Sequence, residues 1–361
     1  MKAKRHIVSF TAGLTVLMTG PALAQDARIA ALEARVAELE ERPQLGFGVG
    51  GVDLTIYGYI KADLIYDLDS DLGNTIFGLG ALAPGGATGS NFRGHAFQSR
   101  LGVRAELDGA TAVLEGDFFG SGGGQFRLRH AYVDIGGLRF GQNWTNFMPI
   151  ESYPSTLDFQ GPAGIPFARV VQARYTHDTG AGLGFSGSIE QSAGSSSEPA
   201  VTAAVFHKGE RHFVKLAALG TRVDTGAGTV DGWGVNLSGN AQLWEGGSLN
   251  ASFTTGEAIS SYMVFGGADT FGGAPVESDG ITIGISQTMD DWTFGIAYGL
   301  RENNVGAATD TERLQTVHLT ANYQIRDNTT LGLEYIVGER DLFNGSSVSA
   351  DRVQAAVQFN F

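Results

Sequence analysis

The residues of this chain best suited to chemistry are arginines that recur along its middle third. Arg is protonated at any physiological pH, and its planar guanidinium group binds a carboxylate through two parallel hydrogen bonds. Several arginines on one surface would therefore attract small anions. The candidate set is Arg100, Arg104, Arg127, Arg129, Arg139 and Arg174.

No catalytic or cofactor-binding constellation accompanies them. The chain has seven His and no Cys, and no His stands in a motif with a serine nucleophile or at metal-ligand spacing. Gly46, Gly48 and Gly51 formally match a dinucleotide fingerprint, but that motif needs a strand before it and a helix after it. Here a heptad segment precedes the glycines and a strand-like segment follows. The sequence therefore predicts no enzyme, no cofactor and no metal site.

Period-two alternation determines which way the arginines point. In 95–107, Phe97, Leu101, Val103 and Leu107 share one face, which leaves Arg100 and Arg104 on the other. In 125–135, Phe126, Leu128 and Tyr132 share a face opposite Arg127 and Arg129. The short segment 138–143 opposes Leu138 and Phe140 to Arg139. In 169–177, Val171, Ala173 and Tyr175 oppose Arg174.

Many such segments occur, and their connections alternate between long and short. We expect sixteen strands, near 52–68, 95–107, 110–119, 125–135, 138–143, 169–177, 182–192, 199–207, 211–223, 231–243, 247–257, 279–288, 291–301, 312–325, 329–340 and 350–361. Short turns at one end and long loops at the other are typical of transmembrane β-barrels. The predicted fold is all-β, a 16-stranded antiparallel transmembrane β-barrel. An arginine on its lipid face would cost ~2–4 kcal/mol at mid-depth, so the six arginines should face the lumen.

The last strand alternates Val353, Ala355, Val357, Phe359 and Phe361 with polar or small residues. A strand that ends in an aromatic residue resembles the final strand of bacterial outer-membrane barrels, which the barrel-assembly machinery reads. Phe361 is thus the predicted C-terminal assembly signal. With an even number of strands, both ends of the barrel chain lie on the periplasmic side.

The N-terminal region precedes the barrel with different patterns. A basic start, a short apolar run and an A-x-A site predict a signal peptide, residues 1–24, cleaved between Ala24 and Gln25. Apolar residues spaced three and four apart within 25–43 predict a short periplasmic α-helical coiled coil. A Gly-rich linker, 44–51, would join it to the barrel, 52–361.

Composition limits the partners. The net charge is −14, and loss of a signal peptide with three basic and no acidic residues makes the chain more negative. This charge argues against a nucleic-acid partner. Outer-membrane lipid is the expected surrounding.

The long segment 144–168 is the predicted constriction loop. It is rich in Pro and aromatic residues, including Trp144, and its only charges within the loop are Glu151 and Asp158. Opposed to the arginines, these carboxylates would set a transverse field across the narrowest point. The alternative is that arginines and carboxylates neutralise one another as wall-packing ion pairs.

The order of these features resembles DcaP-like trimeric outer-membrane porins: signal peptide, heptad helix, Gly linker, TIYGYIKADLIYD at 55–67, GQNWTNF at 141–147 and terminal VQFNF. The resemblance implies a homotrimer and small anionic solutes such as dicarboxylates. His130 and Asp134, which share parity with Phe126 and Leu128, would then lie at a subunit interface. A non-selective diffusion porin, a sugar-specific porin and a barrel anchoring the outer membrane to the cell wall are the alternatives.

Overall fold

The structure is a computed structural model that describes residues 45–86 and 88–361. The predicted signal peptide, 1–24, and the predicted coiled coil, 25–43, lie outside the described residues. Within the described part, no helix is long and apolar enough to cross a membrane.

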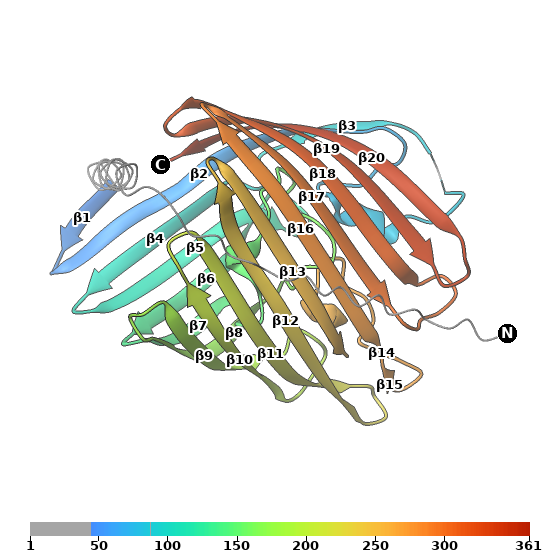
Figure 1. Ribbon diagram of the computed structural model, residues 1–361, viewed down its shortest axis with the longest axis horizontal. Helices are drawn as coiled ribbons and strands as arrows, with labels where there is room; N and C mark the ends of the chain where they lie inside the picture. The colour runs from blue at the N-terminus through green and yellow to red at the C-terminus, as the bar shows by residue number, and fades with distance from the viewer. Residues whose placement is uncertain (1–44, 87) are drawn as a thin grey trace. The chain divides into compact units, whose positions relative to one another are not determined.

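Antiparallel strands form one closed barrel (Figure 1). Strand β2 pairs on one side with β20 and on the other with β3 and β4, which closes the ring. The remaining neighbours follow one another along the chain. The strands of the barrel wall are β2 (Val52–Asp67), β3 (Asn91–His95) with β4 (Arg100–Leu107), β5 (Ala110–Gly120), β6 (Gln125–Ile135), β7 (Leu138–Trp144), β8 (Arg169–Asp178), β9 (Leu183–Gln191), β10 (Pro199–Lys208), β11 (His212–Asp224), β12 (Thr229–Trp244), β13 (Gly247–Glu257), β16 (Glu277–Met289), β17 (Trp292–Asn303), β18 (Thr311–Arg326), β19 (Thr329–Leu342) and β20 (Ser347–Asn360).

The prediction of an all-β barrel with sixteen wall strands is confirmed, with two additions. β3 and β4 pair with successive parts of β2, so together they count as one strand of the barrel wall. A short strand, β1 (Leu45–Val49), pairs with the start of β2 through a turn at Gly50 and Gly51. The stretch predicted as a linker, 44–51, therefore forms a β-hairpin over most of its length.

Outward and inward faces separate as the alternation predicts. In β17, Trp292, Phe294 and Ile296 are 43%, 40% and 59% exposed on the isolated chain, whereas Ala297 is 2% exposed and Arg301 1%. The apolar set faces away from the barrel, where lipid would cover it. The inward set meets water or the loops that enter the barrel.

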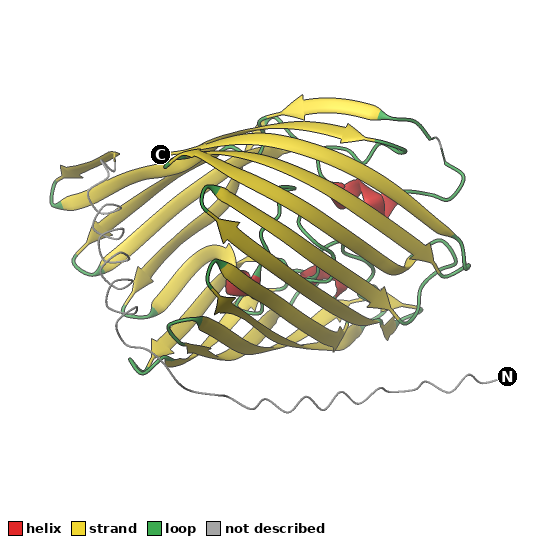
Figure 2. Cartoon of the chain, turned by 45° about the horizontal axis from the view of Figure 1, so that its top comes forward, coloured by secondary structure: helices red, strands yellow, loops and turns green. Residues whose placement is uncertain are grey.

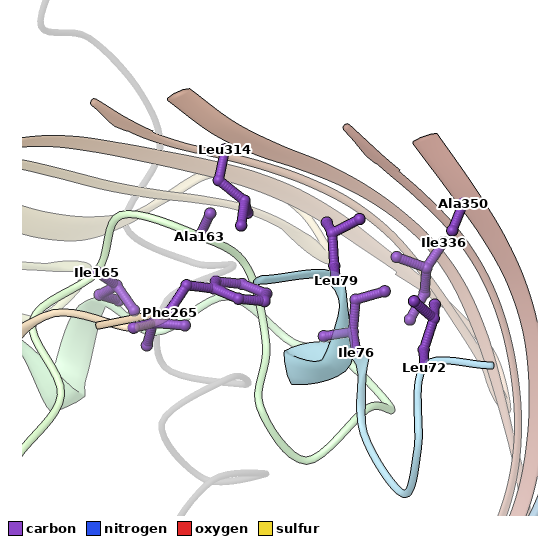
Figure 3. Packing of buried hydrophobic residues seen from close by; sticks show 10 residues of the cluster. Leu72, Ile76, Leu79, Ala163, Ile165, Phe265, Leu314, Ile336 and Ala350 are labelled. Carbon is purple, nitrogen blue, oxygen red and sulfur yellow. The ribbon is translucent and has the colours of Figure 1, made fainter. Parts of the chain in front are cut away.

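The inside of the barrel is partly filled by its own loops (Figure 2). Three 3₁₀ helices, η1 (Ile76–Ala81), η2 (Ile150–Ser152) and η3 (Ser260–Tyr262), belong to these loops. Between η3 and β16, β14 (Thr270–Phe271) and β15 (Ala274–Pro275) form a small hairpin. Figure 3 shows side chains of 72–79, 163–165 and Phe265 packed toward the wall residues Leu314, Ile336 and Ala350.

Two wall glycines let one loop lie directly on the barrel. A Cβ atom on Gly299 of β17 would collide with the backbone of Ala163, and one on Gly280 of β16 would collide with the backbone of Gly164. Any larger side chain at these positions would push the loop into the lumen. The path of residues 162–164 along the wall therefore depends on glycine.

A β-bulge at Arg129 of β6 gives three residues an orientation opposite to the predicted one. The pairing of β5 with β6 passes from Glu115↔His130 to Gly116↔Leu128 and skips Arg129. An extra residue in one strand reverses the parity of everything after it. The prediction that Tyr132 faces lipid and that His130 and Asp134 face a subunit interface is therefore wrong. His130 is buried, and Asp134 faces the lumen opposite Arg139.

The predicted outward orientation of Phe97 is also wrong. The wall strand is interrupted between β3 and β4, because residues 96–99 do not belong to either strand. Phe97 packs instead against the ring of His95 at 4.6 Å and edge-on against Phe119 at 5.9 Å. Phe119 in turn stacks on Phe159 of the loop inside the barrel.

Candidate functional site

Residues 145–168, here called the inserted loop, connect β7 to β8 and run through the interior of the barrel. Its first turn is held by Glu190 of β9, which is 1% exposed. The Glu190 carboxylate accepts hydrogen bonds from Thr145 Oγ1 at 2.5 Å and from the Asn146 N–H at 2.8 Å. A charged acceptor of this kind strengthens each bond and leaves the buried carboxylate satisfied.

The middle of the inserted loop is held through its backbone carbonyls. Lys215 Nζ of β11 donates to Met148 O at 3.0 Å, and Asn250 Nδ2 of β13 donates to Tyr153 O at 2.9 Å. Asn240 of β12 donates to the carbonyl of Glu151. These bonds hold the main chain and leave the Glu151 carboxylate free to face the lumen.

The far end of the inserted loop is held on the opposite wall. Glu334 of β19, which is fully buried, accepts the N–H groups of Leu157 at 2.7 Å and Asp158 at 2.9 Å. Lys61 Nζ of β2 donates to Leu157 O at 2.7 Å. The inserted loop is therefore tied to walls on both sides of the barrel and narrows it.

Asp158 does not face the predicted arginines. Its Oδ2 lies 3.3 Å from Nη1 of Arg352 on β20 and accepts the Ile76 N–H at 3.0 Å. Arg352 also forms a two-bond pair with Asp67, at 2.7 and 3.1 Å. Burial raises the pKa of the Asp158 carboxyl, and the charge of Arg352 opposes that rise. Asp158 thus fixes the loop and contributes little to a field across the lumen.

Three of the predicted arginines form a dense ion-pair cluster with the inward carboxylates of β5. Arg127 holds Asp117 with two bonds, at 3.0 and 2.7 Å. Arg129 reaches both Asp117, at 2.9 Å, and Glu115, at 3.1 Å. Arg100 Nε lies 3.3 Å from Glu115. Here three positive charges face two negative ones, so the cluster keeps a net positive charge.

Two further arginines are also paired. Arg139 binds Asp134 through two bonds of 2.7 Å, and its guanidinium lies 4.0 Å from the centre of the Tyr132 ring. Arg104, near the end with the short turns, lies 3.4 Å from Glu106, and both side chains are about half exposed, at 51% and 52%. An exposed pair of this kind contributes little to stability.

Trp144, predicted as part of the constriction loop, is the last residue of β7. The guanidinium groups of Arg129 and Arg169 lie 5.5 and 5.2 Å from its ring, which are cation–π distances. The indole therefore bridges two positive side chains where the inserted loop begins.

Arg174 differs from the other five because no carboxylate of the described residues lies within 4 Å of it. The same is true of Lys215, which is 7% exposed and donates only to the Met148 carbonyl. Both line a cavity of about 440 Å³ on the short-turn side of the inserted loop. The cavity is lined by Asp134, Gly137, Arg139, Asn146, Glu151, Arg174, Thr176, Ser186, Phe206, Phe213 and Lys215.

Of the charged residues that line this cavity, the sequence predicted that Arg139, Arg174 and Glu151 face the lumen, but it did not single out Lys215. The signal was available, because Lys215 alternates with the outward residues Val214 and Leu216, which are each 45% exposed. The cavity brings three cationic side chains together with the carboxylates of Asp134 and Glu151. Among the described residues, no group of three His, Cys, Asp or Glu side chains could hold a metal ion.

Comparisons with known proteins agree with this architecture. The family described as Gram-negative porin matches residues 11–341. The outer membrane channel DcaP of Acinetobacter baumannii superposes with a TM-score of 0.81 at 24% identity, over 88% of this chain and 99% of that one. An anion-selective porin from Comamonas acidovorans has a TM-score of 0.63 at 16% identity, over 86% and 100%. OmpT of Vibrio cholerae has a TM-score of 0.61 at 14% identity, over 88% and 99%. No curated protein matches the sequence.

Proposed function

This chain belongs to the Gram-negative porin family, and we propose that it forms a water-filled outer-membrane channel that favours small anions such as dicarboxylates. Solutes cross such a channel by passive diffusion, with no catalysis and no cofactor. The family and the barrel already support a channel, so the preference for anions is the part that we propose.

The observation that carries this proposal is the pair Arg174 and Lys215, two cations that face the 440 Å³ cavity without a carboxylate within 4 Å among the described residues. A unit charge 4 Å from an anion contributes about 1 kcal/mol in bulk water and about 4 kcal/mol where the effective dielectric constant is near 20. Low-dielectric walls focus such fields along a pore. Within the inserted loop, Glu151 is the one carboxylate that lines the cavity with these two cations.

The cluster of Arg100, Arg127 and Arg129 supports the same preference less directly. Most of its charge is compensated by Glu115 and Asp117, as in the alternative of wall-packing ion pairs. Its remaining positive charge, together with Arg169, still lies beside the inserted loop. A channel governed only by these neutralised pairs would be a non-selective diffusion porin, which is the second candidate.

The surroundings of the channel follow from the sequence and from the resemblance to trimeric porins. We expect a homotrimer in outer-membrane lipid, with the helix 25–43 in the periplasm after cleavage between Ala24 and Gln25. Phe361 is expected to present the last strand to the barrel-assembly machinery. It exchanges backbone hydrogen bonds with Gly58, at 3.0 and 3.1 Å, where the barrel closes.

The test is the reversal potential of the purified full-length protein in a planar bilayer under a salt gradient. An anion-selective sign is expected, and the double variant Arg174→Gln, Lys215→Gln should move it toward cations. The matched control is Arg222→Gln, because Arg222 is exposed and paired with Glu198 and Asp231 at the other end of the barrel. Cation preference of the parent protein would leave the porin standing and would refute the anion preference. Folded protein without channels would favour an anchor, which a peptidoglycan pull-down would reveal.

A further inference from the structure

A second cavity, of about 290 Å³, lies at the end of the barrel with the long loops. It is formed by the ends of β17 and β19 and by three connections, which contain η1, the hairpin β14–β15 and residues 304–310. Its lining residues are Gly80, Phe265, Gly266, Gly267, Ala268, Phe271, Arg301, Asn303, Val305, Gly306, Asp310, Thr311 and Arg340. Gly267, Ala268 and Phe271 are exposed, so the cavity opens to solvent.

Arg301 is an almost fully buried side chain among the lining residues, with 1% of its surface exposed. It donates to Phe265 O at 3.3 Å and to Asn303 Oδ1 at 2.9 Å, and both acceptors are neutral. Its Nε is buried with no hydrogen-bond acceptor. Asp269 lies beyond ion-pair distance of Arg301 and accepts the Ser261 N–H instead.

Arg340, which is 9% exposed, also binds only neutral groups. It donates to Thr311 Oγ1 at 2.8 Å, to Thr309 O at 3.2 Å and to the carbonyl of Leu82. The one lining carboxylate, Asp310, is exposed and accepts the Ala307 N–H at 2.8 Å. No carboxylate of the described residues lies within 4 Å of either arginine.

Burying a guanidinium group without a counter-charge is costly, and its unused donors favour an anionic ligand. The backbone makes room for this arrangement, since a Cβ atom on Gly267 would collide with the Arg301 guanidinium. Two charged donor groups at the wall of a small, solvent-open cavity match the carboxylate or phosphate of a small solute.

We infer that this cavity is an outer binding site where small carboxylate or phosphate solutes bind before they reach the inserted loop. Arg301 and Arg340 have the same inward parity as the rest of the lumen wall, so the ligand is a solute within the barrel and not a lipid headgroup outside it. This role rests on the proposed anion transport, while binding itself is measured separately.

The experiment places a reporter in the cavity with Phe271→Trp, since Phe271 is exposed at its edge. Full-length protein in neutral detergent at low ionic strength is titrated with succinate and, separately, with inorganic phosphate. A saturable change in tryptophan fluorescence is expected. Arg340→Gln in the reporter background should weaken binding about tenfold, as expected for the loss of one contacting charge.

Because Arg340→Gln could impair folding, Ala268→Glu provides a second variant. Ala268 is exposed, so the new carboxylate supplies an internal counter-ion without removing any packing. It should abolish the titration, whereas Arg222→Gln should leave it unchanged, because Arg222 is exposed and lines neither cavity. Absence of saturation, or equal weakening by Arg222→Gln, would overturn the inference. Saturation by phosphatidylglycerol in mixed detergent micelles with none by succinate would also overturn it. A cation-selective reversal potential with the titration intact would refute the proposed function alone.

Discussion

Removing the charge of Glu151 should make the channel more anion-selective. Glu151 is the only carboxylate that the inserted loop presents to the cavity with Arg174 and Lys215. The loop is held there by the carbonyl of Glu151, which accepts from Asn240, so Glu151→Gln keeps this anchor. The substitution therefore changes charge with little change in shape.

The expected magnitude follows from Coulomb's law. A carboxylate about 4 Å from a passing ion contributes about 1 kcal/mol in water. Its removal lowers the energy of an anion and raises that of a cation at the same place. The two changes together amount to about 2 kcal/mol, so the ratio of anion to cation permeability should rise about thirtyfold, since 1.4 kcal/mol corresponds to a factor of ten.

The assay is the reversal potential of Glu151→Gln in a planar bilayer under a salt gradient, compared with the parent. Glu245→Gln is the matched control, because Glu245 is exposed on a short turn outside the cavity. A gain of selectivity cannot result from partial unfolding, which makes this variant more informative than loss of an arginine. An unchanged potential, or a shift toward cations, would refute the electrostatic reasoning.

Three further outcomes are expected. Glu334→Gln should loosen the far end of the inserted loop, because it weakens the acceptor for the N–H groups of Leu157 and Asp158. Denaturant titrations should show a loss of about 1–3 kcal/mol in the free energy of unfolding, and an unchanged midpoint would contradict this. Gly299→Val should displace residues 162–164 from β17 and alter single-channel conductance, whereas the outward substitution Ile296→Val should not. Deleting Phe361 should lower the yield of heat-modifiable barrel in the outer membrane, since its backbone bonds to Gly58 at the barrel closure are lost; normal assembly would argue against an assembly signal there.

The barrel was predictable because strand alternation is a local property. Arg127 is flanked by the outward residues Phe126 and Leu128, and Arg139 by Leu138 and Phe140, so the cost of a charge in lipid leaves one orientation. The bulge at Arg129 and the break at 96–99 were not predictable in this way. Each depends on the pairing register with a neighbouring strand, which no alternation within one strand encodes.

The amino-acid sequence by itself determined the closed β-barrel, the direction of Arg100, Arg127 and Arg174, and the segment that enters the lumen. Only the tertiary structure decided how the charges are shared. It pairs Arg127 with Asp117 and Asp158 with the distant Arg352, and it leaves Arg174 and Lys215 facing a cavity. The reason is physical: alternation depends on neighbours along the chain, whereas ion pairing depends on distances of a few ångströms between residues that only the closed barrel and its inserted loop bring together.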